Sequence, residues 1–144
     1  MEYPKLPYFP FGESGENSMP ASYEIDKQRR LVFSTGVDPF TLADGLAHQE
    51  KLVQDPDFDP SFSQIMDFTR IAQFDLEASS VRRLAQRTLF SPGSRRAIIV
   101  STDLAYGFGR MYEILRENYG DYGIRVFRNV DKALDWILSK NLTA

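Results

Sequence analysis

Residues 63–87 read SQIMDFTRIAQFDLEASSVRRLAQR, and this stretch decides the fold. Residues 63–69 are rich in apolar side chains and read as a buried strand, which a polar turn follows. Residues 76–89 then place apolar side chains at helical spacing, while Arg82 and Arg83 lie on the opposite face. The expected inward side chains are Val81, Leu84, Ala85 and Leu89. A strand, a turn and an amphipathic helix in this order predict one unit of an α/β protein.

The alternation of strands and helices continues on both sides of this unit. Residues 22–26 and 31–36 flank the polar run KQRR and predict a β-hairpin. A helix begins at Thr41, where Asp44 completes an approximate capping box, and it ends before Pro56. The later elements that we expect are a strand at 97–100, a helix at 104–118, a strand at 124–128 and a last helix capped by Asn129. This order, a hairpin followed by α-β-α-β-α-β-α, predicts a mainly parallel sheet.

Helical spacing also predicts which faces of the first and third helices meet the sheet. The expected inward side chains are Leu42, Leu46 and Val53 in the first helix and Leu104, Phe108, Met111 and Leu115 in the third. Gly107 and Gly109 interrupt the third helix, and we expect close packing on the sheet to compensate for them. Gly120 suits the end of that helix.

Composition indicates one globular domain with an N-terminal arm. The chain has 144 residues, of which 42% are hydrophobic and 26% charged, and its net charge is -3. Residues 1–20 are rich in proline and aromatic side chains, so we expect an arm there and a single domain at 21–144. The charge gives no attraction to nucleic acid, and no apolar run is long enough to span a membrane. The N-terminus lacks the pattern of a secretory signal, which favours a cytoplasmic location.

Few residues offer catalytic or metal-binding chemistry. The chain has no cysteine and one histidine, His48, which lies off the expected apolar stripe and which we interpret as a surface side chain. Asp55, Asp57 and Asp59 alternate, but Pro60 stands where a calcium loop needs glycine, so we predict an acidic turn and no metal. Only carboxylates, tyrosine and arginine are available for acid–base chemistry and no spacing selects a catalytic pair, so an enzyme ranks below a binding function, and we predict no cofactor.

Several runs together resemble a known superfamily. They are YEIDKQRRLVFSTG, DPDFDP, QIMDFTRIAQFD, RRAIIVSTDLAYGFGRMYEI and IRVFRNVDKALDWIL. Their order and spacing over residues 20–140 resemble the STAS (SpoIIAA-like) superfamily, particularly its branch related to CRAL-TRIO lipid-binding domains. The resemblance implies a β-α superhelix with a four- or five-stranded sheet and helices mostly on one face. It implies no enzyme activity, since its members bind partner proteins, and some bind nucleotides or apolar ligands.

The resemblance also locates a switch position, and this chain departs from it. The family usually carries a phosphorylated serine in the turn before the second helix, and that serine corresponds to a position near Glu77. The matching run is Asp75-Leu76-Glu77-Ala78, so the hydroxyl is missing unless Ser79 or Ser80 replaces it. Glu77 has a structural interpretation too, because a negative charge is stabilising near a helix N-terminus.

The predicted topology brings polar residues together beyond the carboxyl ends of the parallel strands. Ligands often bind at this edge of a sheet, and helix N-termini with arginine nearby can hold an anion. The residues that we expect there are Thr69, Arg70, Asp75, Ser101, Thr102, Asp103, Tyr106, Arg110, Arg128 and Asn129. Helix capping alone also accounts for Asp75, Asn129 and either Thr102 or Asp103. The Gly107–Gly109 pair lacks the third glycine of a phosphate-binding loop.

Two binding functions rank above an enzyme. The leading hypothesis is a module that binds another protein through the second helix, with Arg82 and Arg83, and the loop at residues 70–75. The alternative is a carrier of a small apolar or anionic molecule or a lipid, which needs a pocket of about 300 Å³ or more. We also expect a homodimer, because helices on one face leave part of the sheet to be covered.

Overall fold

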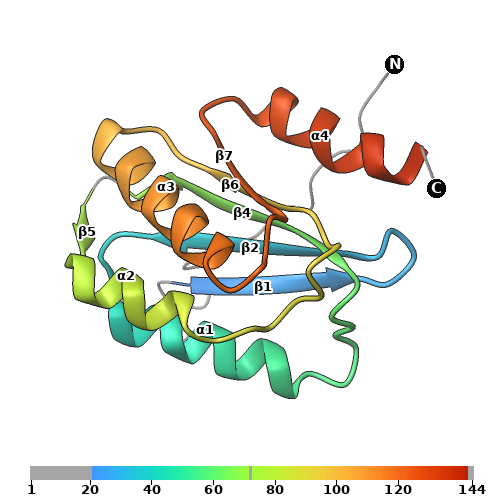
Figure 1. Cartoon of the computed structure of the whole chain (residues 1–144), viewed down its shortest axis with the longest axis horizontal. Coiled ribbons are helices and arrows are strands. Elements are labelled where there is room, and N and C mark those ends of the chain that lie inside the picture. Colours follow the sequence, from blue (N-terminus) through green and yellow to red (C-terminus); the bar gives the residue numbers. More distant parts are fainter. Residues whose placement is uncertain (1–20, 72, 143–144) are drawn as a thin grey trace, which may run out of the picture.

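The computed structural model describes residues 21–71 and 73–142, and the expected N-terminal arm lies outside these residues. A five-stranded sheet has the order β1-β2-β4-β6-β7 (Figure 1). Its strands are β1 (Ala21–Asp26), β2 (Leu31–Val37), β4 (Ser63–Arg70), β6 (Arg96–Ile99) and β7 (Ile124–Phe127). The helices are α1 (Leu42–Gln54), α2 (Ala78–Ala85), α3 (Asp103–Glu117) and α4 (Val130–Leu142). The predicted α/β class and order of elements are confirmed.

The sheet is mainly parallel, as predicted. β1 pairs antiparallel with β2 in the expected hairpin, and β2, β4, β6 and β7 are parallel to their neighbours. Two further strands of two residues each, β3 (Phe40–Thr41) and β5 (Phe74–Asp75), form a separate parallel pair. The sequence did not predict this small sheet, because two residues are too few to show a strand period.

The helices are divided three to one between the two faces of the sheet. One core cluster joins odd-numbered strand residues such as Ile65, Ala97 and Ile99 to Ala133 and Ile137 of α4. The even-numbered residues of β4 and β6 point to the opposite face, because side chains alternate along a strand. α1, α2 and α3 cover that opposite face, and α4 lies apart from them (Figure 1). The expected concentration of helices on one face is therefore confirmed.

α1 begins where the sequence predicted, but it presents a different face to the sheet. The Thr41 hydroxyl accepts from the Asp44 amide at 3.2 Å, and the Asp44 carboxylate accepts from the Thr41 amide at 2.9 Å, which completes the capping box. The buried residues of α1 are Gly45, Gln49 and Leu52, whereas Val53 is 39% exposed. The predicted stripe was wrong because Gly45 lets α1 approach Leu84 of α2 closely, and this contact sets the rotation of the helix.

α2 and α3 also differ from the prediction in detail. α2 ends at Ala85, four residues earlier than expected. Leu104 was expected to face inward and is 55% exposed, while Ala105, Gly109 and Arg116 are buried. A Cβ on Gly109 would lie 3.1 Å from both γ-carbons of Val126, so the close packing expected of this glycine is present. Gly107 has open space around it, and the same expectation was wrong there.

Candidate functional site

A cavity of about 120 Å³ lies between the sheet and the three helices α1, α2 and α3. Apolar side chains line most of it, including Met66, Ile98 and Val100 from the sheet and Val81 and Phe108 from the helices. A cavity of comparable size in another protein, about 150 Å³, accommodates benzene. The space is therefore suited to a compact molecule, and it has its own polar groups.

Three polar side chains lie on the sheet surface that faces this cavity. They are Ser34 on β2, Gln64 on β4 and Arg96 on β6, all of them buried. Gln64 and Arg96 are direct partners across the parallel β4–β6 pair, so their side chains are neighbours on one face. The Gln64 amide also donates to the Ser34 hydroxyl at 2.9 Å. A polar line therefore crosses three adjacent strands in the middle of the protein.

His48 faces this polar line, and its interpretation as a surface side chain was wrong. Its Nε2 lies 2.9 Å from the Ser34 hydroxyl oxygen, and its ring packs edge-on against Tyr23 with the ring centroids 5.6 Å apart. Burial lowers the pKa of His48 from 6.5 to about 4. Because Gln64 already donates to the Ser34 oxygen, the hydroxyl proton can be donated to a neutral His48. A ring with so low a pKa is a poor general base at neutral pH.

Gln49 is the next polar residue of α1 that faces inward. Its side-chain Nε2 donates to the Leu84 carbonyl near the end of α2 at 3.0 Å, and this contact fixes the orientation of the amide. Its Oε1 is buried and forms no hydrogen bond with any residue that the structure describes. Sequence reasoning missed Gln49 because a helical stripe is normally recognised by apolar residues.

A buried group of charges closes one end of the cavity. Arg96 Nη1 donates to Asp121 at 2.8 Å, and Arg116 Nε donates to the same carboxylate at 3.1 Å. Burial would raise the pKa of Asp121, but the hydrogen bonds and charges of Arg96 and Arg116 outweigh it and hold the pKa below its ordinary value. A Cβ on Gly123 would overlap the Ser94 carbonyl, so only glycine fits beside this group.

The side chains that line the cavity carry a net positive charge. Arg87, Arg96 and Arg116 line it, and no aspartate or glutamate does so among the described residues. Arg87 is paired with Glu50 at 2.6 Å, outside the cavity, and this pair is exposed to solvent. The Nε of Arg96 is buried and forms no hydrogen bond with any residue in the described ranges. An arginine directly before the apolar run 97–100 was the signal in the sequence that could have identified this site.

Several residues predicted at the carboxyl ends of the strands form hydrogen bonds there. The Ser101 hydroxyl donates to the Thr69 carbonyl at 2.7 Å, which joins the end of β4 to the loop after β6. The Thr102 hydroxyl accepts from the Ala105 amide at 3.1 Å and caps α3. The Asn129 side chain accepts from the Lys132 amide at 3.1 Å and caps α4. Capping therefore accounts for both Thr102 and Asn129.

Other predicted residues at this rim form ion pairs or ring contacts at or near the surface. Arg128 lies 2.7 Å from Asp103, which is 93% exposed, and its guanidinium lies over the Tyr106 ring at 4.8 Å from the centroid. Arg110 pairs with Glu113 one turn further along α3, at 2.5 Å. The Arg128–Asp103 pair is open to water, where ion pairs contribute little, whereas the Glu113 side chain is only 12% exposed. The rim therefore holds the predicted polar residues without a buried pocket around them.

The residues predicted around α2 do not join this rim group. Asp75 lies in β5, opposite Thr41 of β3, and does not cap a helix. Glu77 is the N-cap residue of α2, and its amide donates to the Ser80 hydroxyl at 3.3 Å. Arg70 is the last residue of β4 and is exposed. The side chains of Arg82 and Arg83 are exposed as well.

Two classes of site are not seen in the described part of the chain. No group of three or more histidine or acidic side chains there is arranged to hold a metal ion. No helix among the described residues is long and apolar enough to cross a membrane. A second, open depression of about 390 Å³ is lined by residues of the β1–β2 hairpin alone, including Glu24 and Arg29, so solvated charges surround it.

A comparison with solved structures finds a similar protein. It is an uncharacterised protein of the DUF3478 family from Shewanella loihica PV-4, whose crystal structure has a SpoIIAA-like fold. The TM-score is 0.53 and the sequence identity is 20%, over 81% of this chain and 93% of that one. No protein-family model matches the sequence, and no curated protein matches it. The resemblance to SpoIIAA-like proteins is confirmed at the level of the fold, and the chain is an α/β protein with a SpoIIAA-like fold.

Proposed function

We propose that this protein is a non-enzymatic module that binds a compact small molecule between its sheet and its helices α1, α2 and α3. The observation that supports this proposal is the cavity of about 120 Å³, with apolar walls and a few buried polar groups. Ligand sites commonly combine a mostly apolar surface with a small number of polar groups that orient the ligand. The Ser34–His48 pair beside the cavity is unsuited to nucleophilic catalysis, because the pKa of His48 is about 4.

The size of the cavity limits the ligand. A site for a drug-sized molecule or a lipid needs about 300 Å³ or more, and this cavity is smaller. The lipid-carrier form of the hypothesis therefore has no support from the cavity. A molecule close to the size of a single aromatic ring is the occupant that we propose.

Filling the cavity provides the test. Ala105 lines it and is buried, so Ala105→Leu places three additional carbons in the space. Ala43 is exposed on α1, and Ala43→Leu is the matched control. A panel of ring-sized compounds, both neutral and charged, is screened by ligand-observed NMR against the three proteins. We expect at least one compound to bind the wild type and the Ala43 variant and not the Ala105 variant. Absence of binding across the panel would contradict the proposal.

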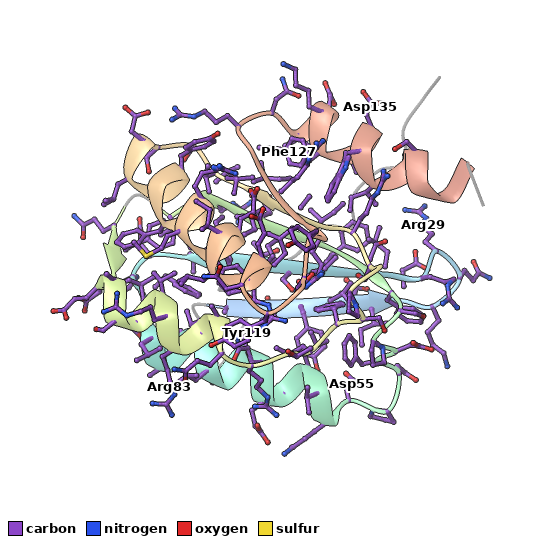
Figure 2. All side chains as sticks on the ribbon, viewed as in Figure 1. Arg29, Asp55, Arg83, Tyr119, Phe127 and Asp135 are labelled. Carbon is purple, nitrogen blue, oxygen red and sulfur yellow. The ribbon has the colours of Figure 1, made fainter. Side chains whose placement is uncertain are left out.

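Protein binding through α2 is a second candidate, favoured by a separate observation. Arg82 and Arg83 are both exposed, and neither forms an ion pair with another described residue. Figure 2 shows Arg83 on the outer side of α2, directed away from the rest of the molecule. The N-cap residue of α2 is Glu77, which has no hydroxyl, so this proposal includes no phosphorylation at that position.

A charge-reversal experiment tests this second candidate. Pull-down with the wild type is compared with the double variant Arg82→Glu/Arg83→Glu. Lys132→Glu, at an exposed position on α4 across the sheet, is the control for a change of charge. We expect a partner to be lost only in the double variant. Equal recovery of every partner by all three proteins argues against this surface.

A further inference from the structure

Two buried polar atoms in the cavity wall lack partners. They are Arg96 Nε, a donor, and Gln49 Oε1, an acceptor, and neither forms a hydrogen bond with any described residue. The two residues are 3% and 8% exposed, and both line the cavity. Buried polar atoms in native proteins are nearly always hydrogen-bonded, because desolvating them without a partner is costly. One unused donor and one unused acceptor therefore need a partner in the cavity, which ordered water or a bound molecule can supply, and the charge of the site decides between them.

A chain of contacts connects these two residues. The side chains of Gln49 and Arg116 donate to consecutive carbonyls at the end of α2, those of Leu84 and Ala85, at 3.0 and 2.8 Å. Arg116 in turn shares the Asp121 carboxylate with Arg96. Gln49 and Arg96 are therefore linked through one continuous polar group, at the end of the cavity where β4 and β6 begin.

The net charge of this polar group favours one sign of charge on the ligand. Arg96 and Arg116 carry two positive charges against the single negative charge of Asp121, and all three side chains are buried. Asp121 is the shared partner, and the cavity walls contain no acid among the described residues that could balance the remaining charge. Charges interact strongly where water is excluded, so an anion is favoured there over a neutral group.

We infer that the cavity binds a compact organic acid, whose carboxylate accepts a hydrogen bond from Arg96 Nε. A hydroxyl or amino group on the same molecule donates to Gln49 Oε1, and the apolar body lies against Met66, Ile98 and Phe108. This inference rests on the proposed small-molecule function and adds the chemical class of the ligand. An arginine suits this role because its guanidinium remains charged when it is buried.

The test compares a charged probe with neutral molecules of the same size. Isothermal titration calorimetry measures the binding of benzoate, 3-hydroxybenzoate, 4-hydroxybenzoate, benzamide and toluene to the wild-type protein. We expect benzoate to bind about tenfold or more tightly than benzamide and toluene, because hydrogen bonds to charged groups are stronger than neutral ones. At least one hydroxybenzoate should bind more tightly than benzoate. Equal affinity for benzoate and toluene would overturn the inference and leave the proposed small-molecule function standing.

A near-isosteric variant locates the binding group. Gln49→Glu places a carboxylate in the cavity beside the buried arginines, whereas Gln86→Glu makes the same change of charge at an exposed position. Benzoate affinity should fall about tenfold or more in the first variant and remain unchanged in the second, while toluene binding is retained in both. Equal loss of benzoate binding in both variants, or in neither, overturns the assignment. If Gln49→Glu does not fold, the wild-type comparison of benzoate with benzamide decides the question.

Discussion

His48 should make the stability of the protein depend on pH between about 4 and 6.5. Burial lowers its pKa from 6.5 to about 4 in the folded protein. Within this range the unfolded chain holds the extra proton and the folded chain does not, so the free energy of unfolding falls as the pH is lowered. Linkage gives a loss of about 2 kcal/mol between about pH 7.5 and about pH 5.0.

A single substitution isolates the contribution of His48 to this pH dependence. His48 is its one histidine, so His48→Gln removes every histidine titration from the protein. Glutamine can still hydrogen-bond to Ser34, whose hydroxyl contacts the ring at present. Asp121 has a pKa held below its ordinary value and titrates at lower pH than this window. Urea unfolding at the two pH values should show the loss of stability in the wild type and a much smaller change in the variant.

Direct titration provides an independent check. A protein with one histidine gives one set of imidazole signals in NMR spectra, and their pH dependence reports the pKa of His48. A measured pKa near 6.5 would refute the argument, because it would show that packing of the half-buried ring against Tyr23 and Ser34 does not disfavour its charged form. The same conclusion would follow from equal pH dependence in the wild type and in His48→Gln.

Other predictions concern the elements that hold the site together, and thermal or urea unfolding measures each of them. Gly123→Ala should destabilise the protein by about 1 to 3 kcal/mol through overlap with the Ser94 carbonyl, whereas Gly107→Ala, in open space inside α3, should stabilise it by up to about 1 kcal/mol. If both glycine variants changed the stability in the same direction, the packing argument would be contradicted. Asp121→Asn should cost about 3 to 5 kcal/mol, because it leaves two buried arginines without a charge partner. A cost below about 1 kcal/mol would show that the two charges are reached by water. Thr102→Ala should cost about 1 kcal/mol by removing the cap of α3, and no measurable change would rule out the cap as a source of stability.

The order of the elements could be predicted because several local signals agreed. The capping box at Thr41 fixed the start of α1, and the continuous apolar run before Ser101 indicated a strand covered on both faces. Gly120 adopts a positive φ of 79° after α3, as its predicted place at a helix end requires. These signals depend on a few neighbouring residues, so they can be recognised without knowing the tertiary structure.

The rotation of the helices could not be predicted in the same way. α1 turns Gly45 and Gln49 toward the sheet because the glycine allows a close approach to Leu84 and the glutamine amide binds the carbonyl of the same residue. Both contacts are with α2, which lies far along the chain. A search for apolar stripes instead selects residues such as Leu104, which is 55% exposed. Sequence patterns therefore did not predict which polar residues are buried.

The cavity lies deeper in the protein than the predicted rim, and sequence reasoning missed it for a related reason. The rule that ligands bind beyond the carboxyl ends of parallel strands drew attention to residues such as Asp103 and Arg128. These side chains are there and they pair, but water surrounds them. The cavity has its polar groups near the amino ends of β4 and β6, where Gln64 and Arg96 are neighbours. Only the register between the two strands brings these residues together, and a single sequence does not reveal register.

Most of the buried polar atoms around the cavity already have protein partners, so a ligand is needed only for the few that do not. α2 is a helix of eight residues, and its final carbonyls accept hydrogen bonds from Arg116 and from the Gln49 amide. This role accounts for Arg116, for one end of Gln49 and for Asp121, which holds Arg116 in place. It does not account for Arg96 Nε or for Gln49 Oε1. A buried ion pair can often be replaced by apolar residues without loss of stability. Arg96 also binds Asp121 and lies over the Phe90 ring, so these contacts give the rest of its guanidinium a structural role. Its Nε donor and the extra positive charge are the features that they leave unmatched, and an acidic ligand would match both.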